Sequence, residues 1–286
     1  MLPKKPLIVG CGYWGLALAL QWKEQGRDVT AWVRSLETAE TLRRIHGIDA
    51  RAGDVADPAS WKQFPEDYDW VIHCASSGKG GEEAYRHVYG EGARQIFRQC
   101  PEARFFFVSS TSVYGQTDGS WVDENAPAQP GVGTGKILRE AEDFVLAQGG
   151  TVLRVAGLYG PGRGVLFRRF CAGEAVIEGD GKRWINQVHR DDAVSAVTTL
   201  AERPESAGIW NVVDDAPVTL LDYYTWLAGR LQRPLPPFGP APTERKRGVT
   251  SKRVSNAKLR GAGWTAAHPS FREGLAENVA LAMKES

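Results

Sequence analysis

The chain has 286 residues and a formal net charge of +1, because 35 lysines and arginines offset 34 aspartates and glutamates. That balance offers no strong field for nucleic acid or an anionic membrane, and no run of 18 apolar residues predicts a membrane span. No C-x-x-C pair occurs among the four cysteines, which are Cys11, Cys74, Cys100 and Cys171. Scattered cysteines in a chain of this size predict reduced thiols and a cytoplasmic protein.

The first 164 residues alternate between patterns typical of strands and patterns typical of helices. Short apolar runs predict strands within residues 6–10, 28–35, 49–57, 68–77, 104–115 and 151–164. Apolar residues at helical spacing predict helices over residues 13–26, 37–47, 81–100 and 135–150. This alternation predicts an α/β fold of the Rossmann type, a doubly wound parallel sheet with right-handed crossovers. Ligands bind beyond the carboxyl ends of such strands, so functional residues are expected just after each one.

The regular alternation stops after residue 160. Residues 164–192 are rich in arginine and predict strand and loop. The following segments predict a helix, a strand and a second helix over residues 193–203, 208–215 and 219–231. The C-terminal residues 251–283 predict two short helices around a turn. Between them, the basic stretch TERKRGVTSKR (243–253) predicts either a solvated loop or a patch for an anionic ligand.

The stretch GCGYWG has the spacing G-x-G-x-x-G, directly after a predicted strand and at the start of a predicted helix. In that context the three glycines provide, in turn, a tight turn, close backbone approach to a pyrophosphate, and close packing of helix on strand. The pyrophosphate lies at the helix N-terminus, where N–H groups and the helix dipole favour anions. The residues expected at a dinucleotide are Gly10, Gly12, Tyr13, Trp14 and Gly15. The alternative is a glycine-rich turn without a ligand.

The end of the second strand distinguishes NADP(H) from NAD(H). An NAD-binding enzyme usually places Asp or Glu about 20 residues after the glycines, on the ribose hydroxyls. Arg34 and Ser35 stand there instead, and an arginine suits a 2′-phosphate through charge-assisted hydrogen bonds. We therefore expect NADP(H) rather than NAD(H), although Arg34 could also be a solvated loop residue. Asp54 is expected at the adenine, and Ala75 and Ser76 beside the cofactor ribose.

Four further segments complete a resemblance to a known family. They are SSTSVYG (109–115), LRVAGLYGPG (153–162), GDGKRWINQVHRDDAV (179–194) and SKRVSNAKLRGAGWTAAHPSFREGL (251–275). With the glycine fingerprint, they resemble the extended short-chain dehydrogenases/reductases, the group of NAD-dependent epimerases and dehydratases, and most of all its divergent, atypical members. The resemblance implies an NAD(P)-binding domain over residues 1–160, completed by about 186–213. It also implies a small, mainly substrate-binding C-terminal lobe over 161–286.

The catalytic residues depart from the family pattern. In that family a Ser or Thr polarises the substrate oxygen, a Tyr transfers the proton, and a Lys four residues after the Tyr holds the nicotinamide ribose. By resemblance Ser110 matches the hydroxyl and Lys136 the lysine, but Val132 stands where the tyrosine would be. A valine cannot act as a general acid. The stretch PGVGTGK (130–136) lacks the spacing of a phosphate-binding loop, which favours an altered Tyr-x-x-x-Lys.

Several groups could supply the missing proton. Tyr159 and His189 are candidates, a water molecule or the substrate itself could serve, and Thr134 without a base is a poor acid. Ser110 and Lys136 could also be structural, as a strand-end hydroxyl and a helix-start lysine. On the substrate side we place Thr111, Tyr159, Arg163, Arg183 and His189. Together with Arg168 and Arg169, these arginines favour an anionic, possibly sugar-nucleotide-like, substrate.

The sequence leaves three functions open. The first is an NADP(H)-dependent oxidoreductase with a modified acid/base site, and the second is an epimerase or dehydratase that keeps its cofactor tightly bound. The third is a catalytically inactive protein that senses NADP(H) or binds a metabolite. The five histidines are dispersed and predict no metal site. By resemblance, the helices predicted at 81–100 and 135–150 form a homodimer interface.

Overall fold

The computed structural model describes residues 5–64, 67–78, 80–240 and 250–284. Of the basic stretch 243–253, residues 243–249 lie outside the described residues. The chain divides into two compact units. The first unit comprises Met1–Val113, Pro130–Arg154 and Val197–Trp210, and the second comprises Tyr114–Gln129, Val155–Ala196 and Asn211–Ser286. No helix among the described residues is long and apolar enough to cross a membrane.

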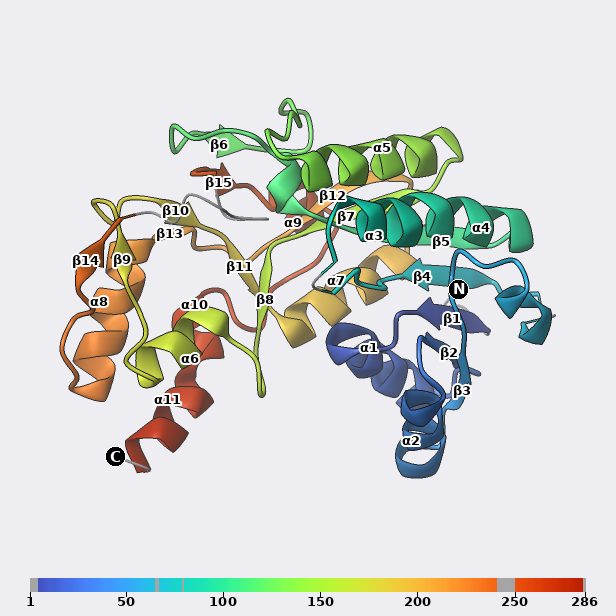
Figure 1. The fold of residues 1–286 in the computed structure, drawn as a ribbon, viewed down its shortest axis with the longest axis horizontal. Helices are drawn as coiled ribbons and strands as arrows, with labels where there is room; N and C mark the ends of the chain where they lie inside the picture. The colour runs from blue at the N-terminus through green and yellow to red at the C-terminus, as the bar shows by residue number, and fades with distance from the viewer. Residues whose placement is uncertain (1–4, 65–66, 79, 241–249, 285–286) are drawn as a thin grey trace. The chain divides into compact units, whose positions relative to one another are not determined.

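A seven-stranded sheet forms the centre of the first unit (Figure 1). In spatial order its strands are β12 (Gly208–Val212), β7 (Thr151–Val155), β5 (Arg104–Ser110), β4 (Trp70–His73), β1 (Pro6–Val9), β2 (Thr30–Val33) and β3 (Asp49–Ala52). The pairs that join β3, β2, β1, β4 and β5 are parallel. Strands β1, β2 and β4 are buried along their whole length, as expected for parallel strands covered on both faces. The predicted Rossmann-type α/β fold is confirmed.

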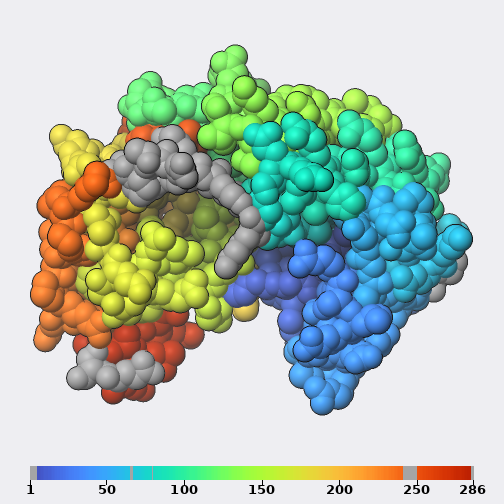
Figure 2. Space-filling model, viewed as in Figure 1, coloured from blue at the N-terminus to red at the C-terminus, as the bar shows by residue number. Residues whose placement is uncertain are grey.

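Helices cover both faces of this sheet. Figure 1 shows α4 and α5 on one face and α1 on the other, and Figure 2 shows how α2 and α4 contribute to the surface of this unit. The helices are α1 (Tyr13–Glu24), α2 (Leu36–His46), α3 (Glu82–Tyr85), α4 (Gly92–Gln99), α5 (Gly133–Ala147) and the end of α7 (Arg190–Ala201), with 3₁₀ turns at Ser60–Gln63 and Thr111–Val113. The helix predicted at 81–100 is present, but a π-helical segment, Arg86–Glu91, joins α3 to α4.

The second unit consists of short elements. Its strands pair two by two: β10 (Trp184–Ile185) with β13 (Val218–Thr219), β11 (Gln187–His189) with β8 (Gly157–Tyr159), β14 (Phe238–Gly239) with β9 (Ile177–Glu178), and β15 (Arg253–Val254) with β6 (Trp121–Val122). Its helices, besides the start of α7, are α6 (Val165–Cys171), α8 (Leu220–Leu231), α9 (Ala257–Gly261), α10 (Phe271–Gly274) and α11 (Ala276–Lys284). The sequence predicted one short helix after the C-terminal turn, but two helices, α10 and α11, are present there.

One prediction for this unit was wrong. Residues 164–192 were expected to form strand and loop, yet Val165–Cys171 is a helix. Phe167 and Phe170, three residues apart, are both buried, while Arg168 and Arg169 between them are exposed. That spacing is one turn of an amphipathic helix, which the adjacent arginines concealed.

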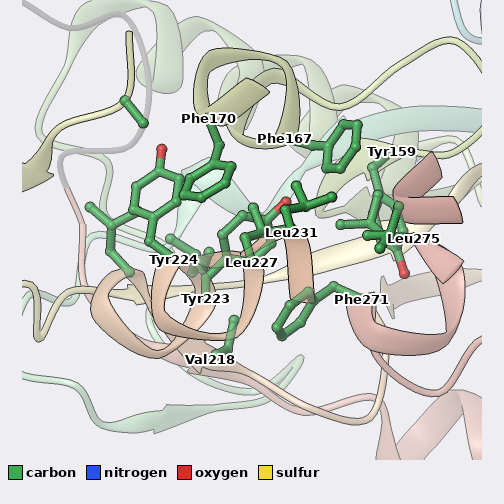
Figure 3. Close-up of a cluster of buried hydrophobic side chains, with 14 of the residues drawn as sticks. Tyr159, Phe167, Phe170, Val218, Tyr223, Tyr224, Leu227, Leu231, Phe271 and Leu275 are labelled. Carbon is green, nitrogen blue, oxygen red and sulfur yellow. The ribbon is translucent and has the colours of Figure 1, made fainter. Parts of the chain in front are cut away.

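The core of the second unit is built on aromatic rings from α6, α8 and α10 (Figure 3). The Phe170 and Tyr224 rings stack with centroids 6.0 Å apart, and those of Tyr223 and Phe271 lie 4.6 Å apart. Tyr159 of β8 belongs to the same core. This unit therefore has a hydrophobic core of its own.

Candidate active site

The glycine fingerprint forms a tight cradle between β1 and α1. Gly10 has φ +96°, which a residue with a Cβ rarely adopts, and a Cβ there would lie 2.2 Å from the backbone nitrogen of Ala75. A Cβ on Gly15 would lie 2.7 Å from the carbonyl oxygen of Gly10 and 3.0 Å from Cys74 Sγ. Both positions therefore require glycine for packing. A Cβ on Gly12, by contrast, would meet nothing closer than 4.0 Å, so the backbone at Gly12 is open to a ligand.

The start of α1 fits a bound pyrophosphate. Gly12 is the N-cap residue, no side chain caps the helix, and its first turn contains no acidic residue. The partial positive charge at the start of a helix dipole favours an anionic group at this position. Buried in the same turn, Trp14 Nε1 has no hydrogen-bond partner among the described residues. These features suit the diphosphate of a dinucleotide.

Arg34 and Ser35 follow β2 directly. Both are exposed, and Ser35 caps α2 by accepting a hydrogen bond from the Thr38 N–H at 3.3 Å. The capping bond fixes the Ser35 side chain, whereas Arg34 is exposed at the end of the strand. The tip of β2 thus carries an exposed arginine and no carboxylate.

Asp54, after β3, has a partner that the sequence did not reveal. His87 Nε2 lies 2.8 Å from both Asp54 carboxylate oxygens, and His87 Nδ1 lies 3.1 Å from Glu91. The Asp54 hydrogen bond raises the pKa of His87. Burial alone would raise the pKa of Asp54, but His87 and the Ala56 N–H outweigh it and lower that pKa. No sequence signal marked His87, because it lies 33 residues away in a predicted helix.

Hydroxyl groups stand at the carboxyl ends of β4 and β5. Ser76 Oγ accepts from the Gly78 N–H at 3.2 Å, and Ser110 Oγ accepts from the Ser112 N–H at 3.2 Å. Thr111 is buried in the turn after β5. The neighbouring Ser109 is buried and donates to Glu142 at 2.5 Å, so Ser110 is the more accessible serine of this pair.

The segment 130–136 is the beginning of α5. Val132 is its N-cap residue, without a side-chain capping bond, and the Lys136 N–H donates to the Val132 carbonyl oxygen at 3.1 Å. Lys136 is exposed, and α5 packs on β5 and the turn that follows it. Val132 and Lys136 thus occupy the first turn of a helix beside the Ser110 strand.

One glycine of this segment has a clear packing role. A Cβ on Gly135 would lie 2.6 Å from Cβ of Pro130, which explains that glycine without a phosphate. A Cβ on Gly133 would lie 1.7 Å from Glu82 Oε1, at the end of a flexible side chain that is 51% exposed. Glu82, at the start of α3, is a second neighbour of this region that the sequence did not reveal.

In the second unit, Tyr159 and His189 are packed rather than open to a ligand. Tyr159 is 1% exposed and donates to the Ser270 carbonyl oxygen at 3.2 Å, and burial raises its pKa. The His189 ring is 5.4 Å from that of Tyr159 and 3.8 Å from that of His268. Burial, and then the charge of His268, lower the pKa of His189. The raised pKa makes Tyr159 a weaker acid, and the His189 ring is enclosed by its neighbours. A proton relay through either residue is therefore less favourable.

His189, Asp192 and His268 place their potential ligand atoms within 4.8 Å of one another. The Asp192 carboxylate, however, accepts the N–H groups of Ala267 at 2.7 Å and His268 at 3.0 Å, and His268 Nδ1 lies 3.0 Å from it. These bonds fasten the loop before α10 to the start of α7. These bonds give the cluster a structural role in this unit.

The two arginines placed on the substrate side differ in surroundings. Arg163 is exposed in the turn after β8. Arg183 is partly buried, and its Nη2 lies 3.4 Å from Glu178 Oε2. Arg183 is therefore held in place by its surroundings, whereas the Arg163 side chain is open to solvent.

Comparisons with known proteins show the family and the fold to which this chain is similar. The NAD dependent epimerase/dehydratase family matches residues 7–213. Protein YeeZ of Escherichia coli K12 is 32% identical over 245 residues, which cover 82% of this chain and 86% of YeeZ. A Methylobacillus flagellatus structure described as an NAD-dependent epimerase/dehydratase has 29% identity and a TM-score of 0.79, covering 98% of this chain and 99% of that one. MoeE5, solved with UDP-glucose and NAD, shares the fold at 24% identity and a TM-score of 0.80, over 98% of this chain and 99% of its own.

Proposed function

Because this chain belongs to the NAD-dependent epimerase/dehydratase family, we propose that it is an NADP(H)-dependent oxidoreductase acting on a small anionic or sugar-nucleotide-like substrate. The observation that carries the proposal is the Gly10–Gly15 cradle, with Arg34 at the exposed tip of β2. The cradle suits a dinucleotide, and Arg34 suits its 2′-phosphate. MoeE5 was solved with NAD. A preference of this chain for NADP(H) would therefore come from its own residues at the end of β2, Arg34 and Ser35.

We assign the first unit to the cofactor and the second mainly to the substrate. Asp54 would accept a hydrogen bond from the adenine amino group, while Ala75 and Ser76 would lie along the ribose. Lys136 would hold the nicotinamide ribose through its ammonium group. Hydride transfer is the chemistry that a bound nicotinamide supplies.

Ser110 would donate a hydrogen bond to the substrate oxygen. Such a bond accelerates the reaction when it strengthens as negative charge develops on that oxygen. Val132 has no proton to give, and Tyr159 and His189 are packed inside the second unit. We therefore assign the proton to solvent water.

The family also favours a second candidate. An epimerase or dehydratase of this fold would oxidise its substrate and reduce the intermediate again on the same bound cofactor, without net consumption of NADPH. MoeE5 was solved with UDP-glucose, which makes sugar nucleotides the first class to test. A binding protein that has lost catalysis, for which Val132 is the argument, would bind cofactor without turnover.

One assay separates these functions. NADPH absorbance and the products are followed together in two arms, one with NADPH and simple carbonyl compounds and one with NADP⁺ and UDP-sugars. An oxidoreductase consumes or forms NADPH in proportion to product, and an epimerase or dehydratase forms product with no net change in NADPH. A sensor binds NADPH and forms no product with any substrate. Absence of dinucleotide binding would contradict both enzymatic functions and the NADP(H) sensor.

We also propose that the protein is a cytoplasmic homodimer joined through α4 and α5. The partly exposed rings of Phe97 and Phe144 lie edge to face with centroids 6.2 Å apart, and Arg94 lies over the Phe144 ring. Such an apolar pair on two adjacent helices suits a self-complementary contact. Light scattering that shows a monomer at micromolar concentration would contradict this proposal.

A further inference from the structure

Two buried tryptophans, to which the proposed function gives no role, hold the backbone around Asp54. Trp32 of β2 donates from Nε1 to the Gly53 carbonyl oxygen at 2.8 Å. Trp61, in the 3₁₀ turn that follows β3, donates from Nε1 to the Val55 carbonyl oxygen at 3.0 Å. One indole N–H is therefore bonded to the residue before Asp54 and the other to the residue after it.

The other backbone groups around Asp54 are also bonded. The Asp54 N–H donates to Ser60 Oγ, and the Asp54 carbonyl oxygen accepts from the Asp57 N–H, both at 3.1 Å. The Ala56 N–H donates to Asp54 Oδ1 at 2.9 Å. Every peptide group from Gly53 to Ala56 therefore makes at least one hydrogen bond, so the backbone that carries the Asp54 carboxylate is fixed.

The tryptophans can hold these bonds because packing fixes their rings. Trp32 is 2% exposed and Trp61 is 3% exposed, and their ring centroids lie 4.4 Å apart. The Phe64 ring stacks on that of Trp32, with centroids 3.9 Å apart and planes inclined by 5°. A side chain that is locked by packing holds its bonding partner in one position. The absence of a Cβ at Gly53 allows this approach, since a Cβ there would lie 2.9 Å from Ser60 Cβ and 3.2 Å from Trp32.

Trp32 also joins this loop to the glycine cradle. Its carbonyl oxygen accepts from the N–H groups of Gly10 at 2.9 Å and Cys11 at 3.1 Å, while its indole group holds Gly53. Arg34 lies two residues further along the chain. One residue is thus bonded both to the segment that we assign to the pyrophosphate and to the segment that we assign to the adenine.

We propose that Trp32 and Trp61 are positioning residues that make the nucleotide site selective for adenine. The inference rests on the proposed function, in which Asp54 accepts a hydrogen bond from the adenine amino group. Hypoxanthine has an oxygen in place of that amino group, and its N–H donor lies at the neighbouring ring atom, N1. A carboxylate that could move would follow the donor to N1, but a carboxylate that is held in place meets the oxygen. The fixed backbone therefore makes the site reject hypoxanthine.

The test compares NADPH with its hypoxanthine analogue, reduced nicotinamide hypoxanthine dinucleotide phosphate, by calorimetry on the full-length protein. The variants Trp32→Phe and Trp61→Phe keep an aromatic ring and remove the indole N–H. Trp70→Phe is the matched control, because Trp70 is also buried but stacks on Phe106, with ring centroids 4.7 Å apart. We expect the wild type to prefer NADPH about tenfold or more. Each of the two variants should lose most of this preference, and the control should keep it.

A double-variant cycle separates positioning from a general loss of stability. Destabilisation lowers the affinity for both dinucleotides and leaves their ratio unchanged. Asp54→Ala should lower the ratio by itself, and adding Trp61→Phe to it should lower the ratio no further, because the tryptophan acts through the carboxylate. The inference is overturned if the wild type binds both dinucleotides with equal affinity or if either tryptophan variant keeps the wild-type ratio. It is also overturned if Trp61→Phe changes the ratio in the Asp54→Ala background.

The same samples are titrated with ADP and IDP, which carry the two bases without a nicotinamide. If NADPH binds and the tryptophan variants keep the wild-type ratio, the positioning role is wrong and the proposed function stands. If the wild type binds ADP more tightly than IDP, the variants lose this preference and no NADPH binds, the positioning role stands and the proposed function is wrong.

Discussion

His87 Nε2 lies 2.8 Å from both carboxylate oxygens of Asp54, so an exposed histidine of the π-helical segment holds the acidic residue that follows β3. His87 lies in the π-helical segment, which packs against α5. π-Helical turns often mark functional positions. If Asp54 contacts the adenine, its partner must also influence cofactor binding.

The first prediction concerns the pH dependence of this pair. The pKa of His87 is raised above its ordinary value of 6.5, so its stabilising contribution is complete below that value and is lost as the pH rises through the raised pKa. The pKa of Asp54 is lowered below 3.8, so the contribution is also lost as the pH falls through that lowered pKa. His87→Gln should therefore destabilise the protein most at mildly acidic pH. The expected loss is below about 1 kcal/mol, because both side chains are largely exposed.

Chemical denaturation of the wild type and His87→Gln across this pH range measures the difference. Glu91→Gln is the control, because it removes only the longer contact, that at 3.1 Å to His87 Nδ1. A destabilisation by His87→Gln that is the same at mildly acidic and alkaline pH would show that the pair does not act through charge.

The second prediction separates the packing role of one glycine from the binding role of another. Gly10→Ala should destabilise the fold by at least about 1–3 kcal/mol from backbone strain, since its Cβ would also meet the Ala75 backbone at 2.2 Å. Gly12→Ala should leave stability nearly unchanged, because its Cβ would meet only the Gly10 carbonyl oxygen, at 4.0 Å. It should nevertheless weaken dinucleotide binding, because the methyl group would occupy the space open to the pyrophosphate.

Thermal unfolding and cofactor titration of both variants provide the measurements. Unchanged dinucleotide affinity in Gly12→Ala would argue against a pyrophosphate at the start of α1. Wild-type stability in Gly10→Ala would contradict the packing role.

These glycines also show how far the sequence could predict the structure. The motif was enough to predict the tight turn at Gly10, which has φ +96°, and the close packing at Gly15, but it did not predict that Gly10 packs against Ala75. The partners of Asp54 and Gly133 could not be predicted, because His87 and Glu82 approach them through the fold from distant positions. The α6 helix was missed for a local reason, since Arg168 and Arg169 obscured its two buried phenylalanines.

The third prediction concerns the altered catalytic residues. Ser110→Ala should leave cofactor affinity unchanged and lower turnover about a hundred- to a thousandfold, a loss of about 2.7–4 kcal/mol of transition-state stabilisation. Lys136→Ala should weaken cofactor binding as well as turnover, because in the proposed function its ammonium group holds the ribose. Calorimetry with NADPH and steady-state kinetics on the best substrate measure the two effects. If neither variant changes turnover or cofactor affinity, the active site lies elsewhere.

Val132→Tyr tests the missing tyrosine directly. A phenol at the N-cap of α5, one helical turn from Lys136, should increase reduction of simple carbonyl compounds if water is the present proton donor. A lower rate would indicate that the site has been rebuilt around another acid and that the ring obstructs it. Val132→Phe is the control, because it adds the ring without the hydroxyl.

The central claim, that the first unit binds NADP(H) through the glycine cradle and Arg34, is tested most directly by calorimetric titration of the wild type and Arg34→Ala with NADPH and NADH. Arg44→Ala, which removes an exposed arginine near the C-terminal end of α2, is the control. We expect the wild type to bind NADPH more tightly than NADH by about 1.5–3 kcal/mol, roughly ten- to a hundredfold. We also expect Arg34→Ala to remove this preference and Arg44→Ala to keep it. Equal affinities of the wild type for the two cofactors would contradict the claim.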